Sequence, residues 1–430
     1  MYSAVKVGTF YGGRYYNYQD VRGEEFINET ANGVTNLQTW NFTVQSSTNE
    51  VTNLWGAAYA AINRINVVLK GLETSPISDA LKSQYRGEAL FLRALAYHSL
   101  VTIYARPFAD GAGNKPGVII YTEPQTSAGN NNKERSTVAE VYQLILDDLN
   151  LAETNLPLTY AAGGTQSLNV TRAHRNAAIA LKTRVYLHMG RYNDVITEGN
   201  KIVSATAPFE AGTGVRHRLE PNINNVFGAA GQTLENVFSF PYTALDLPGT
   251  QNSLNQYYSP GSAGGNGDYS LNLGATGILA NTEWSATDAR RGFNQVTSGK
   301  TYLRKWQANT DFVPVIRYAE VLLNLSEALA RTSPLSVRAT ALLNAVRMRS
   351  DATAVLVPTS QAQQIDMVLT ERRIELLGEG FRSRDLSRLL LPFPAKGVVP
   401  AVATTDNQYI WPIPQSELLV NKTITQNAGY

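Results

Sequence analysis

The sequence predicts a mainly α protein with a tetratricopeptide-like helical-repeat scaffold of about four helix pairs and a long loop-rich insert containing short β-strands. Three observations support this prediction. Apolar residues recur at spacings of three and four over about residues 51–204 and 314–390. Short polar breaks divide these stretches into paired segments. Two long segments, rich in glycine, asparagine and aromatic residues, interrupt the helical pattern.

One helix pair is readable in detail between Ala177 and Val203, in "AAIALKTRVYLHMGRYNDVITEGNKIV". The apolar period breaks at "MGRY" and then resumes, which predicts an antiparallel helical hairpin. The glycine at the turn and the alanines of the first helix match the pattern of one helix pair per repeat, without the full tetratricopeptide consensus.

Further pairs follow the same pattern, but their spacing along the chain is irregular. This predicts a helical-repeat scaffold with insertions and not a regular solenoid. We expect recognition to lie in the insertions. The predicted pairs are residues 51–72 with 83–105, 136–156 with 173–189, 314–331 with 335–350, and a shorter pair within 364–390.

Two segments, residues 10–50 and 205–312, do not fit a helical pattern. The second carries "SPGSAGGNGDYSLNLGATG" and short β-like runs such as "NVFSFPYT". Loops of this length are either functional or disordered. Their high aromatic content favours ordered loops, because rings supply apolar area that can be buried.

Composition excludes several classes of function. The net charge is +2, from 37 basic and 35 acidic residues, so no global field attracts nucleic acid or anionic lipid. There is no cysteine and there are four scattered histidines, so we expect no disulfide, no metal site and no cofactor. No apolar run could span a bilayer, and the N-terminus lacks a signal-peptide pattern. Either the protein is cytoplasmic, or Met1 follows the point where an export signal is removed.

Catalytic motifs are absent. "SGKT" at Ser298–Thr301 lacks the glycine spacing of a phosphate-binding loop, and there is no nucleophile elbow, zinc-protease helix or dinucleotide fingerprint. The glycine-rich stretch at 261–267 is interpreted as a surface loop and not as an anion cradle.

The densest charge cluster is "ERRIELLGEGFRSRDLSR", residues 371–388, in which Glu371, Glu375 and Glu379 would share one helix face until Gly378 and Gly380 end the helix. It could be an acid/base site or an anion clamp. We favour a structural ion-pair network tied to the polar stripe of the helix "RYAEVLLNLSEALAR", because opposite charges at helical spacing satisfy each other. The network residues predicted from these two segments are Arg317, Glu320, Glu371, Glu375 and Arg382.

Several of these motifs together resemble the SusD/RagB family of nutrient-binding outer-membrane lipoproteins of Bacteroidota. They occur in the family's order: "GEALFLRALAYHSLVTIY", "RYAEVLLNLSEALA", "LLNAVRMRS", "ERRIELLGEGFRSRDLSRL" and the closing "WPIPQSELLVNKTITQNAGY". By this resemblance, residues 409–430 form the family's C-terminal signature, a non-helical tail that docks on the scaffold. Pro412 and Pro414 would hold it extended.

The resemblance implies one SusD-like domain over residues 1–430 that is not an enzyme. Such a protein captures a glycan or oligosaccharide at the cell surface and delivers it to a TonB-dependent, SusC-like outer-membrane transporter. A lipid anchor on a cysteine before Met1 would hold it at the outer membrane. The alternatives are a peptide-binding RagB-type member of the family and, less favoured, a glycoside hydrolase that uses acidic residues of the loops: Asp20, Glu24, Glu25, Asp268 and Glu283.

The resemblance also places the ligand site where the N-terminal loop region meets the large insert. Sugars stack on aromatic rings and hydrogen-bond to short polar side chains, so a Trp beside an amide is a suitable platform. The alternative role for each ring is a loop anchor buried against the helices. The predicted ligand-binding residues are Trp40, Asn41, Tyr257, Tyr258, Tyr269, Trp284 and Trp306.

Overall fold

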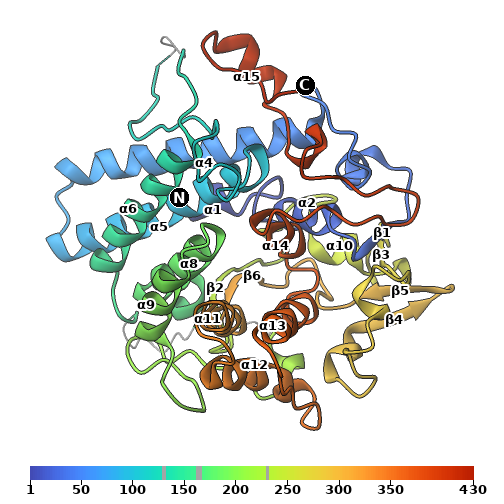
Figure 1. The fold of residues 1–430 in the computed structure, drawn as a ribbon. Coiled ribbons are helices and arrows are strands. Elements are labelled where there is room, and N and C mark those ends of the chain that lie inside the picture. The colour runs from blue at the N-terminus through green and yellow to red at the C-terminus, as the bar shows by residue number, and fades with distance from the viewer. Residues whose placement is uncertain (128–131, 161–166, 229–231) are drawn as a thin grey trace.

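The computed structural model describes residues 1–127, 132–160, 167–228 and 232–430. Its helices form a continuous stack in which each helix packs on the next (Figure 1). The first half of the stack contains α4 (Asn49–Thr74), α5 (Asp79–Tyr104), α6 (Val138–Asn155), α8 (Arg175–His188) and α9 (Tyr192–Ile202). Neither of the long helices α4 and α5, nor any other helix of the described residues, has an apolar run long enough to cross a membrane.

The second half of the stack begins where α9 contacts α11. Helix α11 then packs on both α12 and α13, and α14 follows after a tight turn. The predicted helical-repeat scaffold is therefore confirmed, with most helix ends within a few residues of those expected. The helices of this half are α11 (Tyr318–Thr332), α12 (Val337–Ser350), α13 (Gln361–Glu375) and α14 (Arg382–Arg388).

Short strands form three separate antiparallel pairs. β4 and β5 are joined through Ser298 and Gly299, whose φ angles of 53° and 75° are those of a two-residue type I′ hairpin turn. The "SGKT" sequence therefore consists of the two turn residues, Ser298 and Gly299, and the first two residues of β5. The pairs are β1 (Phe26–Asn28) with β3 (Tyr269–Leu271), β2 (Asn236–Phe240) with β6 (Val313–Arg317), and β4 (Asn294–Thr297) with β5 (Lys300–Leu303).

Helix α2 (Arg14–Arg22) lies inside the segment that the sequence indicated to be helix-poor. All nine of its residues are buried, so it has no solvent-facing polar stripe and shows no amphipathic period. Its C-terminal carbonyls at Val21 and Gly23 accept hydrogen bonds from the buried side-chain nitrogen of Lys396, and burial lowers the pKa of Lys396 well below its usual value.

Two further expectations about helix positions are wrong. The predicted helix 314–331 begins only at Tyr318, because residues 313–317 form β6, in which Pro314 and three β-branched residues suit a strand better than a helix. The C-terminal stretch was expected to contain no helix, but residues 415–420 form α15, which starts directly after Pro414.

The remaining short helices lie outside the stack. They occur in the loop segments and at the two ends of the chain, where Figure 1 shows α1 and α15. Their bounds are α1 (Tyr2–Val5), α3 (Leu37–Trp40), α7 (Leu168–Thr171), α10 (Leu254–Tyr258) and α15 (Gln415–Val420).

The C-terminal tail docks at the end of α5. The backbone N–H of Trp411 donates to the Ile103 carbonyl over 2.8 Å, and the Trp411 ring contacts the rings of Tyr18 and Tyr104. The side-chain amide of Gln426 accepts a hydrogen bond from the Ile413 N–H and donates one to the Ile413 carbonyl, at 2.7 and 2.8 Å. The tail is thus folded back on itself and closed against the helical stack.

Candidate functional site

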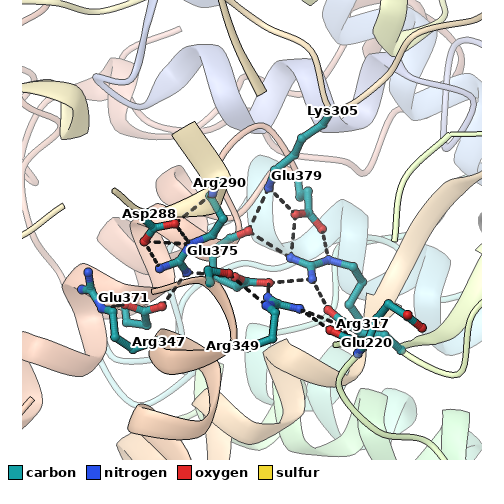
Figure 2. Close-up of polar contacts among 12 residues, drawn as sticks. Glu220, Asp288, Arg290, Lys305, Arg317, Arg347, Arg349, Glu371, Glu375 and Glu379 are labelled. Carbon is teal, nitrogen blue, oxygen red and sulfur yellow. Dashed lines mark hydrogen bonds and ion pairs between the residues drawn. The ribbon is translucent and has the colours of Figure 1, made fainter. Parts of the chain in front are cut away.

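A buried ion-pair network joins the second half of the helical stack to the large insert (Figure 2). Arg317, at the end of β6, lies near its centre. Its guanidinium contacts Glu375 at 2.8 Å and Glu379 at 2.7 Å, and it also reaches Glu235. In the described part of the chain the network holds five cations and five carboxylates: Arg290, Lys305, Arg317, Arg347 and Arg349 with Glu235, Asp288, Glu371, Glu375 and Glu379.

Glu375, the last residue of α13, receives three guanidinium groups. Arg349 approaches to 2.6 Å, Arg317 to 2.8 Å and Arg290 to 2.9 Å. Burial acts to raise the pKa of Glu375, but these arginines outweigh it and hold the pKa well below its usual range. A carboxylate kept ionised in this way is a structural group and is unsuited to general acid or base catalysis near neutral pH.

The sequence prediction placed Glu379 on the same helix face as Glu375, and the turn that follows α13 shows that this placement is wrong. Because α13 ends at Glu375, Glu379 does not share a helix face with it. Gly378 and Gly380 instead take φ angles of +76° and +74°, a left-handed backbone that favours glycine. This turn brings Glu379 back toward Lys305 and Arg317, at 2.7 Å from each.

Two of the five predicted network residues lie elsewhere. Glu320 pairs with Arg184 of α8 at 2.6 Å, and Arg382 pairs with Glu24 at 2.6 Å in a cluster beside α2. Arg382 was therefore wrongly grouped with Glu375, because the reversal of the chain at 376–381 separates α14 from the end of α13. Most network partners come from distant segments, and no local sequence signal marks them.

The polar stripe of α11 is tied to residues 371–388 by a second set of contacts. Arg388 of α14 contacts Glu327 at 2.6 Å, while Arg372 donates to Asn324 over 2.6 Å. Asp385 lies between Arg372 and Arg388, at 2.9 and 2.8 Å. Helices α11, α13 and α14 are therefore joined by charge-assisted contacts as well as by apolar packing.

The predicted aromatic residues of the loops are buried. Trp40 is 6% exposed, Trp284 and Trp306 are 2% exposed, and the three tyrosines are fully buried. The tyrosine hydroxyls bind atoms of other loops: Tyr257 donates to the Gln251 carbonyl and Tyr269 to the Thr35 carbonyl. Because irregular backbone lacks ladder partners, these hydroxyls satisfy carbonyls that would otherwise be stranded.

The structure brings only some of these rings together. Tyr258 lies 5.9 Å from Trp306 and Tyr257 lies 6.5 Å from Tyr269, measured between ring centroids. Trp40 lies apart from this group, and its indole N–H donates to the Phe26 carbonyl. Trp284 is covered by the guanidinium of Arg291, 4.6 Å from its ring.

Asn41 differs from the rings because it is only half-buried. Its side-chain oxygen accepts hydrogen bonds from the N–H and the hydroxyl of Thr43. For the buried rings to contact a ligand, the loops that cover them would have to move. Their ligand-binding role, and that of Asn41, stays a prediction.

Three of the five acidic residues considered for hydrolysis make structural contacts. Glu24 and Glu25 are held by Arg382 and Arg373, at 2.6 and 2.7 Å. Asp20 accepts hydrogen bonds from the Tyr258 hydroxyl and the Gly380 N–H, both 2.8 Å long. Asp268 is buried and Glu283 is exposed. No cluster of three metal-ligating side chains occurs within the described residues.

Replacing Glu375 with alanine is expected to lower the free energy of unfolding by about 3–5 kcal/mol, because three buried arginines then lose a shared counter-ion. Urea denaturation measures the change. Glu73→Ala provides a control, since Glu73 forms an exposed pair with Lys70 on α4 and should cost less than about 1 kcal/mol. Equal effects of the two substitutions would contradict the structural role of Glu375.

Asp20 gives a pH-dependent prediction. Burial raises the pKa of Asp20 from 3.8 to about 8, against the hydrogen bonds from Tyr258 and Gly380. Its contribution to stability is therefore complete below pH 3.8 and is lost as the pH rises toward 8. Between about pH 5 and 9, the free energy of unfolding should fall less in Asp20→Asn than in the wild type. Asp366→Asn, at an exposed position of α13, should leave the wild-type profile unchanged; a wild-type profile in Asp20→Asn would refute the assignment.

The chain is similar to known proteins in both sequence and fold. A family model described as "Starch-binding associating with outer membrane" matches residues 11–187, and the SusD family model matches residues 183–398. A SusD-like protein of Formosa agariphila is 26% identical over 91% of this chain and 83% of its own length.

Solved structures agree with the sequence matches. A SusD superfamily protein of Bacteroides fragilis is 32% identical, with a TM-score of 0.87 over 99% of this chain and 96% of its own. A protein described as a putative sugar binding protein of Bacteroides vulgatus shares the fold at 22% identity, with a TM-score of 0.83 over 100% of this chain and 96% of its own. Taken together with the helical scaffold and the matched motifs, these similarities establish that the chain belongs to the SusD family.

Proposed function

We propose that this protein binds a glycan or oligosaccharide at the cell surface and delivers it to a SusC-like, TonB-dependent transporter of the outer membrane. The observation that carries the proposal is family membership: two family models together match residues 11–398, and one is described by starch binding and association with the outer membrane. The protein has the architecture of a binding protein, a rigid helical stack that supports long loops.

We place the ligand at the surface formed by residues 10–50 and 205–312. These segments are far apart in sequence, but they are joined by the pairing of β1 with β3 and by the contact of Tyr258 with Asp20. Asn41 is partly exposed in the first of these segments, and the neighbouring Trp40 is buried. The buried aromatic residues hold the loops together, so the exposed side chains of the loops can bind a ligand without rearrangement, whereas contact with the rings requires the loops to move.

Binding without hydrolysis is favoured by the contacts of the acidic loop residues. A glycosidase needs two carboxyl groups about 5–9.5 Å apart on either side of a sugar. Glu24 and Glu25 are paired with arginines, and the cavity beside Glu25 and Asp20 is only about 10 Å³. Capture of a peptide, as in RagB-type members, is the alternative function within the same family.

Calorimetric titration with a panel of neutral and acidic oligosaccharides and short peptides tests the proposal. We expect saturable binding of an oligosaccharide, with no reducing ends released on prolonged incubation. Asn41→Ala should weaken this binding by about 1 kcal/mol, the contribution of one hydrogen bond, with an unchanged melting temperature. Asn193→Ala on α9 is the matched control. Binding of peptides alone would favour the alternative, and turnover of the sugar would refute a purely binding role.

We also propose that the protein is attached to the outer membrane by a lipid on a cysteine that precedes Met1 in the precursor. The 430-residue sequence has no cysteine that could carry the lipid. Radiolabelled palmitate fed to the native host should label the precursor product, and the labelled protein should co-purify with a large outer-membrane barrel. An unlabelled protein in the cytosolic fraction would refute both the anchor and the transporter partnership.

A further inference from the structure

A cavity of about 640 Å³ lies beside the C-terminal tail, and none of its lining residues belongs to residues 10–50 or 205–312. Its size is within the range of small-molecule sites. Three parts of the chain form its walls: the loop that follows α5 together with Arg135, the segment that follows α14, and the folded-back tail. The side chains that line it and carry the argument are Arg106, Asp110, Lys115, Arg135, Asn407 and Gln426.

One wall of the cavity is cationic. Arg106 and Lys115 share a single carboxylate, Asp110, at 2.5 and 2.7 Å. Burial acts to raise the pKa of Asp110, but hydrogen bonds from Lys115 and Arg106 lower it, so Asp110 stays ionised. One carboxylate cannot neutralise two cations, and this group keeps a net positive charge.

Arg135 adds a third positive charge to the wall. Its guanidinium donates to the carbonyls of Gly117, Pro116 and Thr425, at 2.7, 3.0 and 3.2 Å, and forms no ion pair in the described ranges. Burial lowers its pKa to about 10, which still leaves it protonated at neutral pH. Three of its five N–H groups are used by carbonyls, so two remain to bind an acceptor.

The opposite walls supply neutral polar groups and one further carboxylate, Asp406, so the lining residues carry three cations and two carboxylates and keep a net positive charge. Thr404, Thr405 and Asn407 come from the segment after α14, and Gln426 comes from the tail. Two hydrogen bonds to the backbone of Ile413 fix the side chain of Gln426. The neighbouring Asn427 donates to the Tyr104 and Trp411 carbonyls at 2.8 and 2.6 Å. Hydroxyl and amide groups on rigid backbone suit a ligand with many hydroxyls.

We infer that this cavity binds an acidic oligosaccharide, one that bears a carboxylate or a sulfate ester. The cationic wall binds the anionic group through Arg135 and Lys115, while the facing threonines and Asn407 bind sugar hydroxyls. A simple inorganic anion would fill only a small part of the volume. The inference rests on the proposed function, since it names the chemical class of sugar and adds a second binding site on the same protein.

The test uses matched tetrasaccharides and measures affinity by calorimetry. The probes are tetragalacturonate, its fully methyl-esterified neutral form, and a sulfated carrageenan tetrasaccharide; the two acidic probes distinguish carboxylate from sulfate recognition. We expect at least one acidic probe to bind at least tenfold more tightly than the neutral ester, and to weaken as salt screens the charges.

Lys115→Gln should lower the affinity for the acidic probe about tenfold, because a hydrogen bond to a charged group is lost. Lys115 is 45% exposed, so the variant should fold normally. Lys70→Gln on α4, where the lysine is 59% exposed and also paired with a glutamate, should leave the affinity unchanged. Ala428→Trp, which fills the cavity and removes no charge, should also abolish acidic binding.

Three results would overturn the inference. Equal affinity for the acidic and neutral probes, with Lys115→Gln unaffected, would refute the cavity but leave oligosaccharide capture intact. Acidic binding that survives Ala428→Trp would place the site elsewhere. Binding of no oligosaccharide by the wild type would refute both the cavity site and the proposed function.

Discussion

Ten charged side chains buried away from water constrain how the second half of this protein can fold. A buried charge without its partner costs several kcal/mol, so each cation of the network must meet a carboxylate. The partners lie on β6, α12, α13 and the segments around Asp288, Glu235 and Glu379. These segments span more than a hundred residues of sequence, and they can satisfy one another only when all of them are in place. The network therefore favours one arrangement of insert and scaffold over looser alternatives that an apolar core alone would tolerate.

The loops are ordered by a different means. They contain few strand ladders, so their carbonyls need other donors, and tyrosine hydroxyls supply many of these. Tyr242 donates to the backbone carbonyl of Lys6, Tyr257 to that of Gln251 and Tyr269 to that of Thr35. The tyrosine-rich composition that suggests sugar stacking is in large part a structural device. A tyrosine offers both apolar area for the core and a hydroxyl for irregular backbone.

The C-terminal tail connects the fold to the second proposed site. The contacts of Trp411 and Asn427 hold the tail against the end of α5, and Asn427 also lines the cationic cavity together with its neighbours Gln426 and Ala428. Arg135 binds the tail through the Thr425 carbonyl. A ligand that binds there would contact the part of the chain that closes the structure, so ligand binding and tail docking should stabilise each other.

The sequence by itself determined the helical scaffold and the family. Helices α4, α6 and α9 show a clear apolar period because one face of each is packed and another is exposed to solvent, and the family motifs are local runs of sequence. It also indicated that residues 371–388 are tied to α11, since charges at helical spacing are visible locally.

Tertiary structure alone decided the rest. Helix α2 is buried on every side and so has no period to detect. Arg382 pairs with Glu24, which lies more than three hundred residues away in the sequence, so no local pattern could predict this ion pair. The burial of Trp40 and Trp306 depends on how the loops cover them. The cationic cavity beside the tail exists because three distant segments meet there. Periodicity reports the environment of one element, whereas burial and ion pairing depend on which elements come together.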